Sequence, residues 1–208
     1  MKLFLATLAV SAFIYSCAND TNNRSNSTDT LHTVKDTTNN TADTGMLAVS
    51  QFSILIDTSD KQLRVIKGGD TVATYPISVG TAKYPTPMGD FKIHQIDFNP
   101  DWTPPEGDWA RNKKPAKPGS ASNPMGRARI IYQMPYTIHG TKDLNSLGEA
   151  ESHGSVRMAN NHVIQLARLI MEETGTTKPE SWFQQTLADS TKMVSVKLNR
   201  TVSLTNRQ

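Results

Sequence analysis

Two His-Gly pairs in the second half of this chain carry the residue types needed for nucleophilic catalysis. The first is His139-Gly140, and the second is His153-Gly154, which is followed at once by Ser155. An imidazole can take the proton of an attacking hydroxyl group, so His139 and Ser155 offer a base and a nucleophile. Gly154 allows close backbone approach, so consecutive N–H groups there could line an oxyanion hole. The alternative for each histidine taken singly is a structural role, because the sequence gives no distance between His139 and Ser155.

Most of the surrounding chain has strand-like patterns. Apolar and β-branched residues recur in short runs that are bounded by turn residues. Between the second and third runs, Gly68 and Gly69 supply the positive φ values that a tight hairpin turn needs. We predict strands over residues 52–56, 62–67, 71–79, 91–96 and 128–133, and a final strand through Val194, Val196 and Leu198.

Two helices are expected after the second His-Gly pair. Asn160 or Asn161 is a suitable N-cap for a helix that runs to about Thr174, and Gly175 is a stop signal just beyond it. The apolar residues of this helix fall on one face, which predicts packing against the core. Pro179 suits the first turn of a second, short helix. The chain is therefore predicted to be mainly β, with one main helix behind the candidate site.

A long segment without periodicity, residues 99–126, separates two of the predicted strands. It is rich in Pro, Gly, Trp and Lys. A loop of this length inside a compact domain is usually functional, often as a lid over a site. The alternative is an irregular surface connection.

The composition limits the class of protein. The chain has 208 residues, a formal net charge of +3 and a single cysteine, Cys17. One cysteine excludes an intrachain disulfide framework, a Cys-rich zinc site and a CxxC redox pair. The small positive charge gives no reason to expect a nucleic-acid partner.

The beginning of the chain resembles a bacterial lipoprotein signal. Lys2 precedes an apolar stretch of 14 residues, which is too short to span a bilayer comfortably and suits a signal peptide. The stretch ends with an aliphatic, a variable and a small residue before Cys17, as in the lipobox. We therefore predict a signal peptide over 1–16, a lipidated Cys17 at the start of a disordered Thr/Asn-rich tether over 17–45, and a folded domain over 46–208. The alternative is an ordinary cleaved signal with an incidental cysteine.

Taken in order, the motifs resemble the L,D-transpeptidase catalytic-domain (YkuD-like) family. That family's signature is a His-Gly pair, a gap, and Ser-His-Gly-Cys before an apolar residue and Arg or Asn. Residues 139–140 and 152–157 match it, with one exception. Further matches occur at 75–80, 85–91, 102–105 and 123–126, so the similarity covers roughly residues 50–200. The resemblance implies a β-sandwich or open barrel with one main helix after the active-site motif.

The resemblance also implies a reaction and the residues that carry it out. The reaction is acyl transfer on peptidoglycan stem peptides, and no metal or cofactor is expected. His139 matches the general base, held by the backbone carbonyl of Gly140, and Ser155 stands at the position of the nucleophile. The N–H groups of His153, Gly154 and Ser155 are the implied oxyanion hole.

On the substrate side, the resemblance implies roles for Arg157, Gly140 and Ser152. Arg157 matches a residue that shapes the site or holds a substrate carboxylate. Together with the predicted lipid anchor at Cys17, the resemblance implies a monomer in the cell envelope, attached to a membrane on its periplasmic or extracytoplasmic face.

The exception to the signature is Ser155, because the family's nucleophile is cysteine. A thiol is readily ionised beside a histidine, whereas a serine hydroxyl loses its proton only during attack. Three interpretations follow. The protein is a serine-dependent acyltransferase or hydrolase, a catalytically silent peptidoglycan-binding or regulatory relative, or an engineered knockout of a cysteine enzyme.

Overall fold

The computed structural model describes residues 52–208. The predicted signal peptide, the lipidation site at Cys17 and the tether over 17–45 lie outside the described residues, as does the start of the predicted domain. No helix within the described part of the chain is long and apolar enough to cross a membrane.

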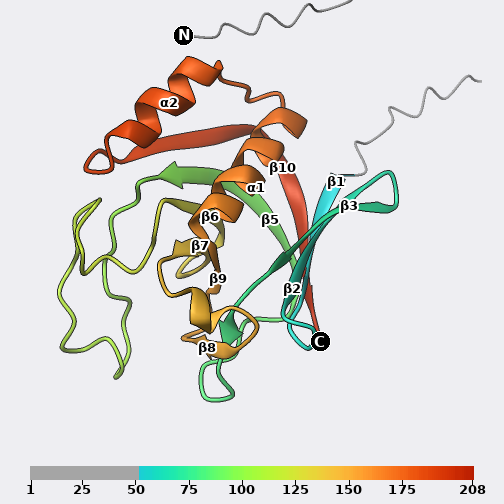
Figure 1. Ribbon diagram of the computed structural model, residues 1–208. Coiled ribbons are helices and arrows are strands. Elements are labelled where there is room, and N and C mark those ends of the chain that lie inside the picture. The colour runs from blue at the N-terminus through green and yellow to red at the C-terminus, as the bar shows by residue number, and fades with distance from the viewer. Residues whose placement is uncertain (1–51) are drawn as a thin grey trace, which may run out of the picture. The chain divides into compact units, whose positions relative to one another are not determined.

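The fold is built on one large mixed sheet (Figure 1). Its eight strands follow the order β3-β2-β1-β10-β5-β6-β7-β9, and β4 and β8 form a separate two-stranded sheet. The strands are β1 (Phe52–Asp57), β2 (Gln62–Lys67), β3 (Asp70–Pro76), β4 (Val79–Gly80), β5 (Gly89–Phe98), β6 (Ala128–Gln133), β7 (Tyr136–Thr141), β8 (Ala150–Ser152), β9 (Val156–Ala159) and β10 (Val194–Arg207). β1 runs parallel to β10, and β7 runs parallel to β9.

The two outer strands of the large sheet approach each other and nearly close it. Ser78, two residues after the end of β3, forms an antiparallel bridge with Arg157 in β9. The two residues exchange backbone hydrogen bonds of 3.0 and 2.9 Å. The predicted open-barrel, mainly β fold is therefore confirmed.

Strand register places a row of polar residues on one face of this sheet. Asp97 in β5 lies opposite Arg129 in β6, Arg129 lies opposite His139 in β7, and His139 lies opposite Arg157 in β9. Residues directly opposite each other share a face of the sheet, so this row continues to Ser78 across the bridge. The intervening residues, such as Ile138, point to the opposite face, where the apolar core lies.

The helix α1 (Asn160–Glu173) covers that core face. It lies against β6, β7 and β9 (Figure 1). Its buried residues are Val163, Leu166, Ala167, Ile170 and Met171, so the predicted apolar face is confirmed. The helix α2 (Glu180–Ala188) is shorter, and its Trp182 and Phe183 pack edge-on against Phe98 at the end of β5.

Three local predictions were wrong. The N-cap of α1 is Ala159, because the side chain of Asn160 accepts a hydrogen bond from the backbone N–H of Arg127 instead of capping the helix. Pro179 is the N-cap of α2 and does not lie in its first turn. The third predicted strand, 71–79, is two strands, since β3 ends at Pro76 before β4 begins.

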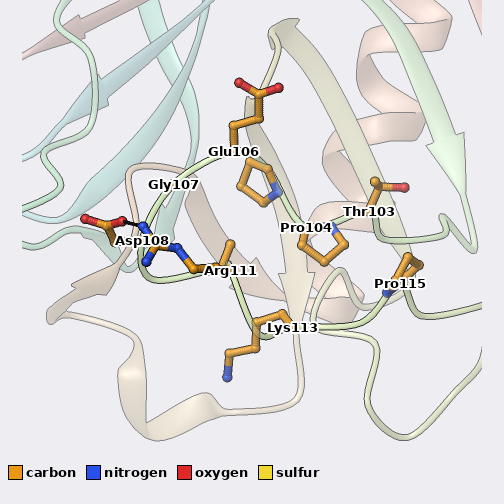
Figure 2. A pocket seen from close by; sticks show the side chains of 10 residues that line it. Thr103, Pro104, Glu106, Gly107, Asp108, Arg111, Lys113 and Pro115 are labelled. Atoms are coloured by element: carbon orange, nitrogen blue, oxygen red, sulfur yellow. Dashed lines mark hydrogen bonds and ion pairs between the residues drawn. The ribbon is translucent and has the colours of Figure 1, made fainter.

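Residues 99–126 form an irregular loop between β5 and β6, as predicted. Its base is fastened by the backbone pairing of Trp102 with Ala116 and by hydrogen bonds from the Asn123 amide to Pro100 and Lys117. Its outer part surrounds an open pocket of about 490 Å³ (Figure 2). The loop is therefore anchored at its base and projects outward beyond it.

Candidate active site

His139 lies in β7 and is buried, with its ring held by the next residue. Its Nδ1 is 2.9 Å from the carbonyl oxygen of Gly140. A carbonyl oxygen only accepts hydrogen bonds, so in the neutral ring Nδ1 carries the proton and Nε2 keeps its lone pair. The arrangement therefore leaves Nε2 able to take a proton.

Burial keeps this ring neutral. It lowers the pKa of His139 to about 4, against the opposing effect of the hydrogen bond to Gly140, and the charges of Arg157 and Arg129 lower it further. At neutral pH His139 is thus an unprotonated imidazole, which is the form that a general base requires.

This shifted pKa predicts how stability depends on pH. The unfolded chain protonates this imidazole below about pH 6.5, whereas the folded protein does so only below about pH 4. The contribution of neutral His139 to the free energy of unfolding is therefore fully present above about pH 6.5. Roughly 3 kcal/mol of it is lost as the pH falls towards 4. Urea unfolding at pH 7.5 and pH 4.5 should show this loss in the wild type and a much smaller loss in His139→Gln. Equal losses in the two proteins would contradict the assignment.

Behind His139, two glycines allow the backbone to pack closely. A Cβ atom on Gly140 would lie 2.3 Å from Oδ1 of Asn160, and one on Gly126 would lie 2.5 Å from the carbonyl carbon of Gly140. Asn160 Oδ1 accepts the N–H of Arg127 at 2.8 Å. This packing fixes Gly140, whose carbonyl in turn orients His139.

Ser155 lies just before β9 and beside the strand that carries His139. Its Oγ accepts a hydrogen bond of 3.2 Å from the backbone N–H of Thr137, two residues before His139 on the same strand. A backbone donor at this oxygen stabilises the negative charge that develops there during proton loss. Among the described residues no hydrogen bond joins Ser155 to His139, although β7 and β9 bring the two residues to one region. The contact with Thr137 is a feature that the sequence did not reveal.

The turn over residues 152–155 is held together by the Ser152 side chain. Its hydroxyl donates to the carbonyl oxygen of Ser155 and accepts the N–H of Gly154 at 3.1 Å. Ser152 is buried and these two interactions support the turn, so its substrate-binding role stays a prediction. The Gly154 N–H is bonded to Ser152 Oγ in this structure, and its oxyanion-hole role stays a prediction. The N–H groups of His153 and Ser155 have no acceptor within residues 52–208, so they are the candidate donors.

Gly154 is required for two separate reasons. Its φ is +104°, and a Cβ atom would lie 2.6 Å from Cε1 of Tyr136. We expect Gly154→Ala to cost about 1–3 kcal/mol more in folding free energy than Gly148→Ala, because Gly148 also has a positive φ of +89° but has open space around it. Chemical denaturation of the two variants measures the difference. Similar losses would mean that the contact with Tyr136 is readily relieved.

Arg157 places an unpaired positive charge at the site. It is half-buried in β9 and opposite His139, and its guanidinium makes no ion pair or hydrogen bond with any residue in the described range. Its charge acts on both His139 and His153. An uncompensated guanidinium in this position is suited to binding a carboxylate.

His153 is stacked between two aromatic rings from separate loops. The Trp109 ring lies nearly parallel to it at a centroid distance of 3.9 Å, and the Tyr84 ring lies 4.9 Å away on a tilt of 40°. Trp109 belongs to the 99–126 loop, so the loop reaches the candidate site. The sequence predicted that this loop could cover a site, but it gave no signal for the contact of Tyr84 with His153.

Known proteins are similar to this chain in sequence, and a solved structure is similar to it in fold. Residues 51–184 match the family described as the L,D-transpeptidase catalytic domain, YkuD. Over 124 residues the chain is 31% identical to a Bacillus licheniformis protein that carries the name L,D-transpeptidase YkuD. The matched region is 59% of this chain and 62% of that protein. Over 118 residues it is 30% identical to a protein of Escherichia coli K12 that carries the name L,D-transpeptidase YbiS, covering 53% of this chain and 39% of that one.

A solved structure is similar in fold alone. The Ldtfm-avibactam carbamoyl enzyme superposes with a TM-score of 0.50 at 13% identity, over 77% of this chain and 50% of that one. The chain spans less than two thirds of the length of the Bacillus relatives that it matches.

Proposed function

Because the chain belongs to the L,D-transpeptidase catalytic-domain family, we propose that it is an acyltransferase or peptidase acting on peptidoglycan stem peptides, with Ser155 as nucleophile and His139 as base. One observation carries the proposal. A neutral, oriented His139 lies on β7, and a serine oxygen that accepts the Thr137 N–H lies just before the neighbouring strand β9. The structural support for a base and a nucleophile in one region is therefore independent of the motif match.

The proposed reaction begins with attack on the stem peptide at the bond before its terminal D-residue. Ser155 Oγ bonds to the carbonyl carbon, and its proton passes to Nε2 of His139. The C–N bond then breaks, and the departing amine takes that proton from the imidazolium. In this proposal the N–H groups of His153 and Ser155 stabilise the oxyanion. An amine or water then attacks the acyl-enzyme, which gives transfer or hydrolysis.

One observation favours a second candidate, a catalytically silent wall-binding relative. Within the described residues, Ser155 and His139 share no hydrogen bond, and an oxygen in a site shaped for sulfur stands farther from its target. A misplacement of about 1 Å can cost on the order of a hundredfold in rate. In this second candidate, Arg157 and the loops bind the cell wall and no acyl transfer takes place.

We place the protein in the cell envelope as a lipoprotein. The proposal rests on the signal-like residues 1–16 and on Cys17, which follows them. It also includes a monomeric state and attachment to a membrane on the periplasmic or extracytoplasmic face. Metabolic labelling with a fatty-acid analogue tests it, since Cys17→Ala should lose the label and leave the membrane fraction.

Incubation of the protein with tetrapeptide muropeptides tests the main proposal. We expect loss or exchange of the terminal D-residue and an acyl adduct on the intact protein, both read by mass spectrometry. His139→Gln should form neither at a comparable rate, because it lacks the base. Wall fragments that bind without any product or adduct would instead support the silent relative.

A further inference from the structure

Two lysines lie on the two segments whose aromatic rings contact His153. Lys83 adjoins Tyr84, and its Nζ lies 5.3 Å from the centroid of the Tyr84 ring. Lys113 lies four residues beyond Trp109 in the 99–126 loop. Since both aromatic rings contact the His153 ring, the segments that carry the two lysines meet at the candidate site.

Neither ammonium group has an ion-pair partner among residues 52–208. Across residues 52–208, no carboxylate pairs with Lys83 or Lys113 at ion-pair distance, and neither side chain donates a hydrogen bond. The nearby Arg111 differs, because it pairs with Asp108 in the same loop (Figure 2). Glu106 lines the same pocket as Lys113, but its side chain points away from Lys113 (Figure 2).

The electrostatic surroundings of His153 agree with this geometry. After burial, the charges that lower the pKa of His153 are those of Arg157, Lys113 and Lys83, and no acidic residue acts in the opposite direction. Positive charges from three separate segments of the chain therefore act on His153. Such a group attracts ligands that carry several negative charges.

We propose that Lys83 and Lys113 bind free carboxylates of the acyl donor and so select stem peptides with free carboxylates over amidated ones. The inference rests on the proposed function and deepens it, because it names the chemical form of the substrate. Arg157 already supplies one cation for a carboxylate next to the reacting bond. The lysines lie on the two loops around it, where further carboxylates of a stem peptide can reach them.

The test compares two tetrapeptide stems that differ only in having one side carboxylate free or amidated. We expect wild-type kcat/KM to favour the free form, and Lys83→Gln and Lys113→Gln each to reduce that preference about two- to fivefold, the usual strength of exposed ion pairs. The double variant should lose most of it, mainly through KM. Lys114→Gln is the matched control, because Lys114 is an exposed neighbour that does not act on His153.

A binding measurement separates this inference from the proposed function. Calorimetry with full-length Ser155→Ala needs no turnover, and it should show the same preference for the free carboxylate and the same loss in the lysine variants. If the protein binds the free stem more tightly than the amidated one but the wild type turns over neither, the proposed enzyme activity is refuted and the lysine sites are supported. Equal affinity for both stems, or a preference that survives in the double lysine variant, would overturn the inference. Higher salt should also weaken the preference, since both lysines are exposed.

Discussion

Replacing Ser155 by alanine is expected to reduce acyl-enzyme formation by at least about a thousandfold, and by as much as about a millionfold if chemistry limits the rate. The reason is that residues 52–208 contain no cysteine, so no thiol within the folded part can take over the attack. The fold should survive, because the hydroxyl makes one hydrogen bond, with the N–H of Thr137. Single-turnover kinetics with a tetrapeptide stem, followed by intact mass, measures the effect.

The informative partner variant is Ser155→Cys. A thiol has a pKa near 8.5 and a longer bond to Cβ, so it is closer to ionisation and reaches farther toward a substrate. The neutral His139 can accept its proton, and the Thr137 N–H can stabilise the thiolate. We expect acylation to be faster than in the wild type, by about ten- to a hundredfold. If the wild type were as inert as Ser155→Ala while Ser155→Cys was active, the chain would be a silenced or engineered form of a cysteine enzyme.

The sequence predicted the strands that have plain local signals. The Gly68-Gly69 turn and the apolar runs on either side of it located β2 and the start of β3, and the helical spacing located α1. The three short strands at the site, β7, β8 and β9, were not predicted. In β7 all but the first residue are buried, but Thr, His and Gly residues alternate with its few apolar ones, so it lacks the apolar run by which the other strands were recognised.

The candidate site was only partly predictable for a related reason. His139, Ser155 and Arg157 are found from their types and order, because the motif keeps them together. The contacts that give them their properties join distant segments. Thr137 meets Ser155 through strand pairing, and Trp109 meets His153 through the course of a long loop. Asn160 shows the same limit, since its local preference for capping a helix yields to a hydrogen bond with Arg127, 33 residues away.

The second large effect is expected from Arg129, which holds a buried carboxylate beside the candidate base. Nε and Nη2 of Arg129 donate to one oxygen of Asp97 at 3.0 and 2.7 Å, and Asp97 is only 1% exposed. Gln95 donates to the other oxygen at 2.8 Å. Arg129→Met leaves the carboxylate buried without its cation, so we expect a loss of about 3–5 kcal/mol in the free energy of unfolding, measured by denaturant titration.

Two comparisons identify the cause of that loss. Arg111→Met breaks a fully exposed pair with Asp108 and should change stability by less than about 1 kcal/mol. The double variant Asp97→Leu/Arg129→Met removes both charges and should recover most of the lost stability, because an apolar pair can replace a buried ion pair. A double variant as unstable as Arg129→Met would show that packing, and not the unpaired charge, is responsible.

The same variants also test whether the Arg129–Asp97 pair affects the pKa of His139. Arg129 lies opposite His139 across the sheet, and its positive charge helps to keep the pKa of His139 low. Arg129→Met leaves a carboxylate in the same row and should therefore raise the pKa of His139, so that activity begins to fall at a higher pH than in the wild type. The double variant, which has neither charge, should lie between the two. The arginines of this row thus add to the burial that keeps the base neutral, and the pair of Arg129 with Asp97 also stabilises the sheet.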